Sequence, residues 1–510
     1  MKISKNTVFY STLLMSLSAF FLQTLGFIYR IMISRLTGAQ GMAIYQLIWP
    51  VYGVIGSISM TGVCSALTKL TAEKHAKSIC CIPPLHNSAK KIFLTLFTTA
   101  SLPVIIFSRW IALNILGDAR CGILLLILMP TMLFTGFENL YKATFYGIRK
   151  VLPTGISEVS ELFVRLVSGT VLVLVCPSDD PAVKAVMIVT GMLISEIFSS
   201  FLMSVFYKNH YIKNKNCHIA KKEKHLLKQL LSFAVPVSGA GLLGNLIGSA
   251  TTIMIPRLLI IWGLPKEEAM SSFGVLKGMV SPLLMFPMIF IGSLSGVIFP
   301  KLSESRALGL QNDIKRKISL SIYVTGLFSL PITAIIIPIG PSLCSILFGQ
   351  KPDSRFFFLL ALVTLCSYYQ VIMGSILNGI GKEKIGALFA IFGGAMQLII
   401  TCIAMPRLGI NGYIVGCFGG SAFSLSAFTI CVLRYSKIKI RWTIWFVYPG
   451  ITASLCGVLG KMFFDWMLRS NFSVLPAVIY VIIGGALLYT LLMDLQGVHP
   501  FKYVKRLMKN

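Results

Sequence analysis

The sequence predicts an all-α membrane protein of about fourteen transmembrane helices, built as two pseudo-symmetric six-helix lobes followed by a C-terminal helix pair. Hydrophobic residues make up 55% of the 510 residues and charged residues only 12%, whereas a soluble chain carries about 25% charged residues. Apolar runs of about twenty residues, the length that crosses a bilayer, recur from end to end. Lysine and arginine gather in alternate loops between these runs.

The first six predicted spans form an N-terminal lobe, residues 1–207. Each span is an apolar run that a short polar or glycine- and proline-containing segment ends. The first run is too long for the core of a signal peptide and no small-residue cleavage site follows it, so we expect a retained helix. The six spans are 8–34, 42–67, 92–116, 121–147, 156–176 and 182–206.

A basic linker, residues 208–229, separates this lobe from a second six-span lobe, residues 230–433. The last region, residues 434–510, contains two more spans and a basic tail. The second lobe has spans 230–262, 272–299, 318–348, 356–380, 385–405 and 410–433, and the helix pair has spans 444–468 and 474–495.

The distribution of basic residues predicts the orientation. Of the 46 lysine and arginine residues, we count 32 with the termini and loops of one side, nine with the other side and five within spans; Arg109, Lys142 and Lys184 are counted with the adjoining loops although the span limits include them. Basic residues stay on the cytoplasmic side of membrane proteins. We therefore expect a multi-pass protein of the bacterial cytoplasmic membrane with both termini in the cytoplasm.

Two short motifs suggest an internal repeat. The triplet at 69–71 (KLT) resembles that at 301–303 (KLS), and the tetrad at 147–150 (GIRK) resembles that at 379–382 (GIGK). Both pairs are 232 residues apart and follow corresponding spans. A repeat of this kind is typical of transporters, in which the substrate site lies between the halves.

Ionisable residues inside spans predict a hydrated cavity, because a charge at mid-bilayer is retained only where it faces protein or water. We expect four cations, Arg30, Arg165, Arg257 and Lys277, to bind substrate there. Glu138, Glu158 and Glu161 are candidate coupling or structural acids.

Each of these residues also has a purely structural interpretation. Glu161 and Arg165, four residues apart on one helix face, could simply pair with each other. Arg257 and Lys277 could extend outward from helix ends. Lys461 and Asp465 have the spacing of a self-neutralising pair in the helix pair, and Glu196 could be a polar contact between helices. Arg30 has no acidic neighbour within a turn.

The sequence predicts no metal and no cofactor, and leaves proton or sodium coupling open. Cys80 and Cys81 are adjacent and lack the CxxC spacing of a metal knuckle. The net charge of +29 does not predict a nucleic-acid partner, because the basic residues lie in loops between apolar spans and not on one wettable face.

Five segments together resemble the stage V sporulation protein B group, within the superfamily of oligosaccharide flippases, lipid II flippases and multidrug and toxin extruders. The segments are LGFIYRIMISRLTGAQGMAIYQL, YGIRKVLPTGISEVSELFVRL, IMIPRLL, FPKLSES and ILNGIGKEKIGALFAIFGGAMQLI. The resemblance implies the extruder-like fold of two six-helix lobes with alternating access. It also implies a basic cavity to which Arg30, Glu161, Arg165 and Arg257 contribute.

The resemblance implies a flippase that carries a lipid-linked oligosaccharide or peptidoglycan precursor, a polyprenyl-pyrophosphate sugar, from the cytoplasmic to the outer leaflet. This activity would serve the cell wall, spore cortex or polysaccharide assembly. We expect a monomer in contact with membrane lipids, with wall-synthesis enzymes as candidate protein partners. Thr251, Lys277 and Gln397 depart from the group's pattern, which puts the usual cation-coupling residues in doubt.

Three rival functions remain at this point. A multidrug or cation antiporter of the same fold would need an acidic or apolar cavity to hold organic cations. A wall-assembly enzyme would need catalytic acids or histidines in a large outer loop, and the predicted outer loops are short. The sequence therefore predicts that the chain is not an enzyme, and it does not exclude a scramblase.

Overall fold

The computed structural model describes residues 5–75, 82–212, 223–438 and 442–496. Within these ranges the chain is helical and contains no strand. Contacts divide it into two compact units, Met1–Ile260 with Leu264–Gly274, and Ile261–Gly263 with Val275–Asn510. Each unit is described by itself.

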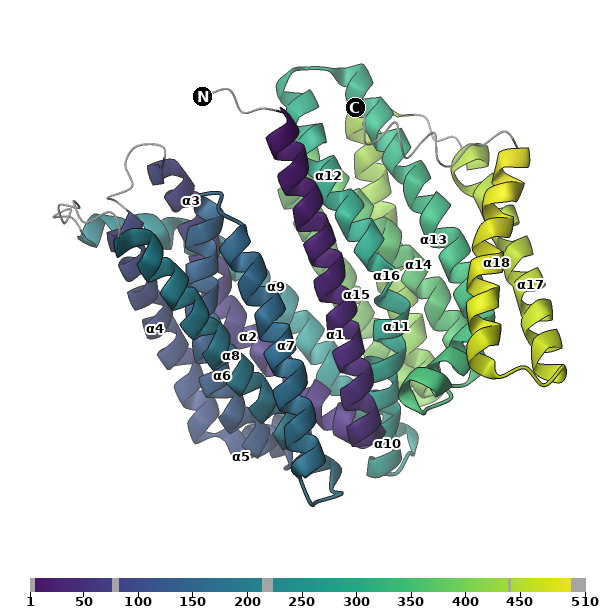
Figure 1. The fold of residues 1–510 in the computed structure, drawn as a ribbon, viewed down its shortest axis with the longest axis horizontal. Coiled ribbons are helices and arrows are strands. Elements are labelled where there is room, and N and C mark those ends of the chain that lie inside the picture. The colour runs from purple at the N-terminus through teal and green to yellow at the C-terminus, as the bar shows by residue number, and fades with distance from the viewer. Residues whose placement is uncertain (1–4, 76–81, 213–222, 439–441, 497–510) are drawn as a thin grey trace. The chain divides into compact units, whose positions relative to one another are not determined.

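The first unit is a bundle of long helices joined by short turns (Figure 1). Gly38, with φ 68°, marks a kink within its first helix. Its elements are α1 (Lys5–Leu47), α2 (Trp49–Gly56), the π-helix η1 (Ser57–Thr61), α3 (Gly62–His75), α4 (Ile82–Ile106), α5 (Ser108–Trp110), the π-helix η3 (Ile111–Leu116), α6 (Cys121–Gly147), α7 (Leu152–Val175), α8 (Pro181–Ile212), α9 (Glu223–Trp262) and α10 (Lys266–Phe273).

The second unit has the same all-helical construction. A core of aliphatic and aromatic side chains joins α12, α13, α14 and α16 within it. Its elements are η4 (Gly274–Val280), α11 (Ser281–Met285), α12 (Met288–Ala307), α13 (Gln311–Phe348), α14 (Ser354–Gly379), α15 (Glu383–Leu408), α16 (Ile410–Ser436), η5 (Thr443–Val447), α17 (Tyr448–Arg469) and α18 (Val474–Leu495).

The contact-based units differ from the predicted lobes, because α9 lies with the first unit although its sequence begins the predicted second lobe. Lobes are defined by internal repetition and units by contacts. The division into 1–207, 208–229, 230–433 and 434–510 therefore stays a prediction.

Helices of membrane-spanning length and composition account for the predicted spans. In the described ranges 11 helices qualify, or 12 when the bent pair Lys266–Met285 and Met288–Ala307 counts as one span. The first qualifying segment, Phe20–His75, is a 56-residue run that contains residues 20–34 of the first predicted span and the whole of the second. The fifth predicted span is α7, a 24-residue helix that holds Glu158, Glu161 and Arg165. All fourteen predicted spans thus fall on helices, and the all-α membrane fold is confirmed.

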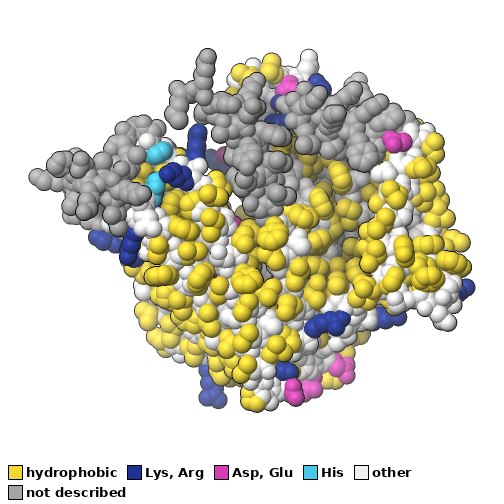
Figure 2. All heavy atoms as spheres, viewed as in Figure 1, with side chains coloured by type: hydrophobic (Ala, Val, Ile, Leu, Met, Phe, Trp, Pro, Cys, Tyr) yellow, Lys and Arg dark blue, Asp and Glu magenta, His cyan; other side chains and the backbone are white. Residues whose placement is uncertain are grey.

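The surface of the described residues is apolar enough to face the lipid of a membrane. Large apolar side chains lie exposed on many helices, with Leu174 66%, Phe201 69% and Leu487 66% exposed. Figure 2 shows hydrophobic side chains over most of the visible face, with charged side chains near its upper and lower borders. Soluble proteins do not expose apolar surface on this scale, and lipid covers it at no cost.

The predicted repeat appears in the backbone. After α6, the amides of Ile148, Arg149 and Lys150 donate to the carbonyls of residues 144, 146 and 145. After α14, the amides of residues 380, 381 and 382 donate to the carbonyls of 376, 378 and 377. The two patterns coincide at the offset of 232 residues. The matched positions Arg149 and Gly381 both have positive φ, 59° and 70°.

Side-chain packing repeats as well. A Cβ added to Gly147 would lie 2.5 Å from the Cβ of Thr71, and one added to Gly379 would lie 2.7 Å from the Cβ of Leu302. Because glycine has no side chain, the helix end at 69–71 can approach the helix end at Gly147, and the helix end at 301–303 can approach the helix end at Gly379. The two motifs found in the sequence are in contact within each unit.

Candidate functional site

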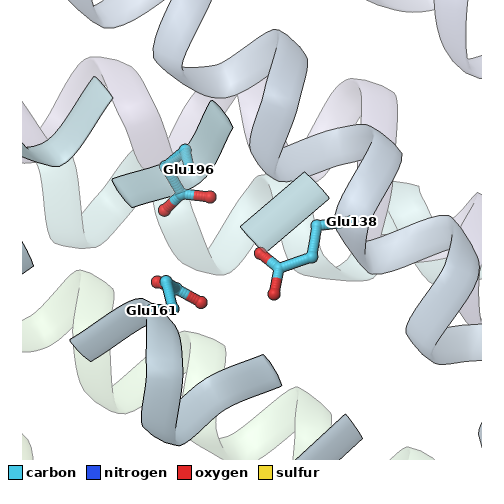
Figure 3. A group of neighbouring side chains, drawn as sticks. All are labelled: Glu138, Glu161 and Glu196. Atoms are coloured by element: carbon cyan, nitrogen blue, oxygen red, sulfur yellow. The ribbon is translucent and has the colours of Figure 1, made fainter. Parts of the chain in front are cut away.

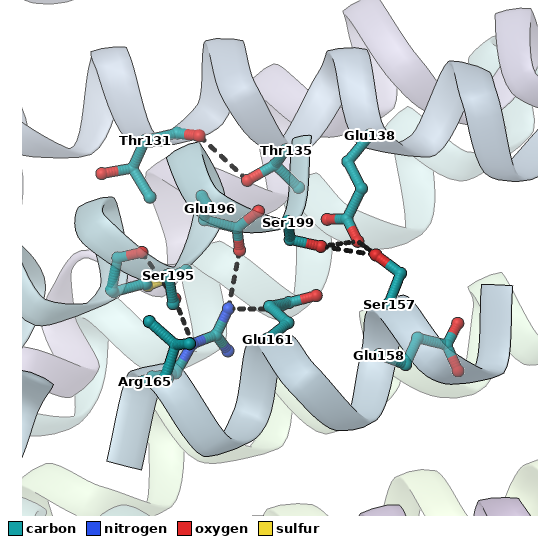
Figure 4. A network of polar contacts seen from close by, with 12 residues as sticks. Thr131, Thr135, Glu138, Ser157, Glu158, Glu161, Arg165, Ser195, Glu196 and Ser199 are labelled. Atoms are coloured by element: carbon teal, nitrogen blue, oxygen red, sulfur yellow. Dashed lines mark hydrogen bonds and ion pairs between the residues drawn. The ribbon is translucent and has the colours of Figure 1, made fainter. Parts of the chain in front are cut away.

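Four of the ionisable residues predicted inside the spans, Glu138, Glu161, Arg165 and Glu196, converge in the first unit between α6, α7 and α8 (Figure 4). α6 packs against α3, α4 and α8, so its side chains face protein. Helical spacing of four residues puts Glu138 and Lys142 on one face of α6, and Glu161 and Arg165 on one face of α7. α8 contributes Glu196 from the facing side.

Glu138 is 2% exposed and is held by donors from three helices. Lys142 Nζ lies 2.8 Å from Glu138 Oε1. The hydroxyl of Ser157 donates to the same oxygen at 3.1 Å, and the hydroxyl of Ser199 donates to it as well. Lys142 neutralises the carboxylate charge, and the three donors together satisfy the hydrogen-bonding capacity of Oε1.

Arg165 bridges two carboxylates. Its Nη2 donates to Glu161 Oε1 on its own helix, and to Glu196 Oε1 on α8 at 2.6 Å. Its Nε donates to the Ser195 hydroxyl at 3.2 Å. The Glu161–Arg165 pair that the spacing allowed is therefore formed. Because both acids hold the guanidinium, the proposed substrate role of Arg165 has less geometric support than that of the other cations.

Lys142 completes the network and was missed as a site residue by sequence reasoning. It was counted with the loop residues up to Lys150, but it lies inside α6. Its Nζ is 3.6 Å from Glu158 Oε1 and 3.7 Å from Glu161 Oε2. Its position four residues after Glu138 was the available signal.

The network has more carboxylates than cations. Glu138, Glu161 and Glu196 oppose Lys142 and Arg165, and Glu158 stands at the more exposed end with 32% of its side chain exposed. Glu196 Oε2 is buried and has no hydrogen-bond partner in the described part of the chain. If all three carboxylates were ionised, this site would carry one uncompensated negative charge.

Figure 3 shows the carboxylates of Glu138, Glu161 and Glu196 pointing toward one another. One oxygen from each lies within 4.8 Å of the other two. A metal ion would need these oxygens for its own shell, but Lys142 and Arg165 nitrogens already bind them. The donor set therefore fits an ion-pair network and does not fit a metal centre.

The other predicted cations of the first unit lie elsewhere. Arg30, half-buried on α1, forms no ion pair with a described carboxylate. Arg257, near the end of α9, donates through Nη2 to the backbone carbonyl of Asn114 in η3. A Cβ added to Gly117 would lie 3.5 Å from Arg257 Nε. Among described residues, no carboxylate neutralises either guanidinium.

The same loop contains a titratable pair outside the membrane-spanning segments. Arg120 Nη2 lies 2.7 Å from Asp118 Oδ2, and Arg120 Nε donates to Asp118 Oδ1 at 3.0 Å. Burial opposes ionisation of Asp118, but the hydrogen bonds from Arg120 outweigh it and lower the pKa of Asp118. The pair fixes the turn between η3 and α6.

The remaining predicted residues belong to the second unit. Lys277 Nζ donates to the Tyr413 hydroxyl at 2.9 Å and lies 5.1 Å from the centre of that ring, so this cation has a neutral partner. Lys461 and Asp465 on α17 are both exposed, and no ion pair joins them in the structure. No contact in the described part of the chain supports this pair, which stays a prediction.

The comparisons with known proteins agree with this architecture. The model of the family described as polysaccharide biosynthesis protein matches residues 8–306, more than half of the chain. The chain belongs to the polysaccharide biosynthesis protein family. The predicted resemblance to the flippase superfamily is confirmed.

Curated relatives in this family's wider group cover most of the chain. Stage V sporulation protein B of Bacillus subtilis (strain 168) is 23% identical over 453 residues, which are 86% of this chain and 86% of that protein. Lipid II flippase MurJ of the same organism is 22% identical over 525 residues, covering 93% and 92%.

Solved structures share the fold of this family member. Lipid II flippase MurJ in an inward closed conformation matches with a TM-score of 0.68 and 15% identity, over 95% of this chain and 98% of that one. An inward-facing MATE multidrug resistance transporter of the MOP superfamily matches with a TM-score of 0.67 and 15% identity, over 82% and 94%. The chain is a membrane protein of the flippase and transporter type.

Proposed function

We propose that this chain is a flippase that moves a lipid-linked oligosaccharide or peptidoglycan precursor from the cytoplasmic to the outer leaflet by alternating access. The cargo is a polyprenyl-pyrophosphate sugar, used for cell wall, spore cortex or polysaccharide assembly. One observation carries the proposal: Arg30, Arg257 and Lys277 lie within a membrane fold with no described carboxylate to neutralise them.

Uncompensated cations in a membrane protein favour an anionic ligand. Guanidinium groups bind phosphate oxygens through paired N–H donors, and an ammonium binds them as a point charge. Both units supply such groups, Arg30 and Arg257 in the first and Lys277 in the second. The lipid II flippase relative, which matches 93% of the chain, supports a cargo that carries pyrophosphate on a lipid.

The membrane potential supports outward movement of such a cargo. Each elementary charge that crosses the membrane is worth about 2.3 kcal/mol per 100 mV. With the cell interior negative, outward transfer of a doubly charged pyrophosphate is favoured by about 4–5 kcal/mol per 100 mV.

The cellular setting follows from the same reasoning. Relatives and structural neighbours are named as flippases and transporters, which supports a transport function and not an enzyme. We place the chain in the bacterial cytoplasmic membrane, as a monomer with both termini in the cytoplasm. Wall-synthesis enzymes are its candidate protein partners.

A liposome assay tests the proposal. Purified protein is reconstituted with a labelled polyprenyl-pyrophosphate sugar, and the precursor that becomes accessible to an external reagent is measured over time. We expect flipping by the wild type, loss of most of it in Arg30→Ala, and partial recovery in Arg30→Lys. Arg109→Ala, which removes an exposed arginine of α5, is the matched control. No flipping of any lipid-linked sugar by the wild type would refute the proposal.

A multidrug or cation antiporter of the same fold is the alternative, favoured by the MATE structural neighbour and by the buried acids of the first unit. Those acids already bind Lys142 and Arg165, which leaves less negative charge for an organic cation. Proton-driven dye export by proteoliposomes, with no effect on lipid-linked sugars, would favour this alternative.

A further inference from the structure

The buried network in α6, α7 and α8 contains an oxygen without a partner. Glu196 is 3% exposed, and its Oε1 accepts from Arg165 at 2.6 Å. Its Oε2 is buried with no hydrogen-bond partner among the described residues, and the neighbouring hydroxyl of Thr135 donates instead to the Thr131 carbonyl at 2.9 Å. An unsatisfied buried oxygen of a charged group is costly, so the bare carboxylate is an unfavourable state of this side chain.

Charge balance leads to the same conclusion. Among the described residues, only the cations Lys142 and Arg165 pair with Glu138, Glu161 and Glu196, so full ionisation leaves one uncompensated negative charge. Like charges in one site cannot all ionise at low dielectric without a large penalty. One proton removes the excess and turns an unpaired acceptor into a donor, with carboxylate oxygens of Glu138 and Glu161 in the same cluster as acceptors.

The two copies of the internal repeat differ in these charged residues, which indicates that the fold itself does not require them. At the offset of 232 residues, Glu138 and Lys142 correspond to Gln370 and Gly374 of α14. By the same offset, Glu161 and Arg165 of α7 correspond to Gly393 and Gln397 of α15. The second copy of the α6–α7 pair therefore packs without these charges. A purely structural role does not explain why one copy keeps them.

We propose that this cluster holds one exchangeable proton at neutral pH, carried by the carboxyl group of Glu196. A solvated proton from the aqueous phase binds Oε2, which converts the carboxylate to a carboxylic acid and leaves water behind. The net charge of the five buried groups then changes from minus one to zero. Glu158, at the more exposed end of the network, is its point of contact with water.

All charged and titratable groups around Glu196 enter this balance. Arg165 holds it directly, and the other groups act from the helices packed around it. These are Glu138 and Lys142 of α6, Glu158 and Glu161 of α7, and Tyr52 of α2. Tyr29 and Tyr45 of α1 act on Arg165. The tyrosines are neutral, so they do not compensate the excess charge.

Infrared difference spectroscopy tests the proton site on purified full-length protein. A buried carboxylic acid gives a C=O stretch separate from that of carboxylates, and this band shifts in D2O. We expect the band in the wild type at neutral pH, its loss in Glu196→Gln, and its retention in Glu73→Gln, which changes an exposed acid of α3. Absence of the band in the wild type, or an unchanged band in Glu196→Gln, would overturn the proposal.

A second variant covers the case in which Glu196→Gln does not fold. Glu196→Asp keeps an acid at the site, so we expect the band to persist at a changed frequency. A band at the wild-type frequency in Glu196→Asp would contradict the assignment.

A role for this proton in transport rests on the proposed function and is tested separately. In liposomes that flip the lipid-linked sugar, we expect an imposed proton gradient to change the flipping rate of the wild type but not of Glu196→Gln. Equal responses of the wild type and Glu196→Gln would exclude a role of this proton in transport without contradicting the flippase proposal.

Discussion

Arg165 Nη2 lies 2.6 Å from Glu196 Oε1 and also contacts Glu161, so one guanidinium ties α7 to α8. Lys142 of α6 lies 3.6 Å from Glu158 and 3.7 Å from Glu161 and so ties α6 to α7. Three neighbouring helices are therefore joined by charges that water does not screen. Five predictions follow from this and the other contacts described above, and each can be measured on purified protein or in cells.

Lys142→Met is expected to lower the free energy of unfolding by about 3–5 kcal/mol, because it leaves Glu138 buried without a counter-charge. Adding Glu138→Gln in the same chain should recover much of this loss. The thermal midpoint in detergent measures both. Lys384→Met, at an exposed position of α15, is the control, and equal midpoints for the two lysine variants would contradict the network.

Gly147→Ala and Gly379→Ala should each destabilise the protein by about 1–3 kcal/mol, because the added methyl overlaps the neighbouring helix end. Gly155→Ala is the control, since nothing lies within 4 Å of its Cβ position. Thermal unfolding of the three variants gives the comparison. A tolerated alanine at both repeat positions would show that the helix ends do not pack as described.

Arg149→Gly should stabilise the protein by about 1 kcal/mol, because a non-glycine residue is strained at the left-handed conformation of this position. The repeat already has glycine at the matched position, Gly381. Lys150→Gly changes the next residue, which lacks positive φ, and should not stabilise. The difference in thermal midpoint between the two variants is the measurement.

The Asp118–Arg120 pair predicts a dependence of stability on pH. Because the pKa of Asp118 is lowered in the folded protein, the pair stabilises the fold above the ordinary value of 3.8, and this contribution is lost as pH falls through the lowered pKa. Thermal midpoints recorded across the acidic range should fall more steeply for the wild type than for Asp118→Asn. Parallel curves would exclude a contribution from the pair.

Orientation can be tested by labelling from outside the cell. In a background without the 12 native cysteines, we expect an impermeant maleimide to label Arg109→Cys but not Lys150→Cys until the membrane is permeabilised. Both side chains are exposed. The reverse pattern would invert the predicted topology.

Local sequence patterns predicted much of the fold and part of the site. The length of apolar runs predicted the spans, since hydrocarbon thickness sets that length. The spacing of Glu161 and Arg165 predicted their pair. The partner of Glu196 could not be predicted, because Arg165 is on another helix and only packing brings the two together. Lys142 was counted with the loop residues although the predicted span 121–147 already included it, and α6 places it inside the helix.

The Asn114 carbonyl restrains Arg257 without neutralising it, because a carbonyl has no net charge. A long, flexible side chain normally loses considerable conformational freedom when it captures an anion. Here the backbone has already removed part of that freedom. The guanidinium has donors to spare beyond the one used, so it keeps its full positive charge in a fixed place. Recognition of a phosphate at this arginine would therefore cost less entropy than at an untethered one.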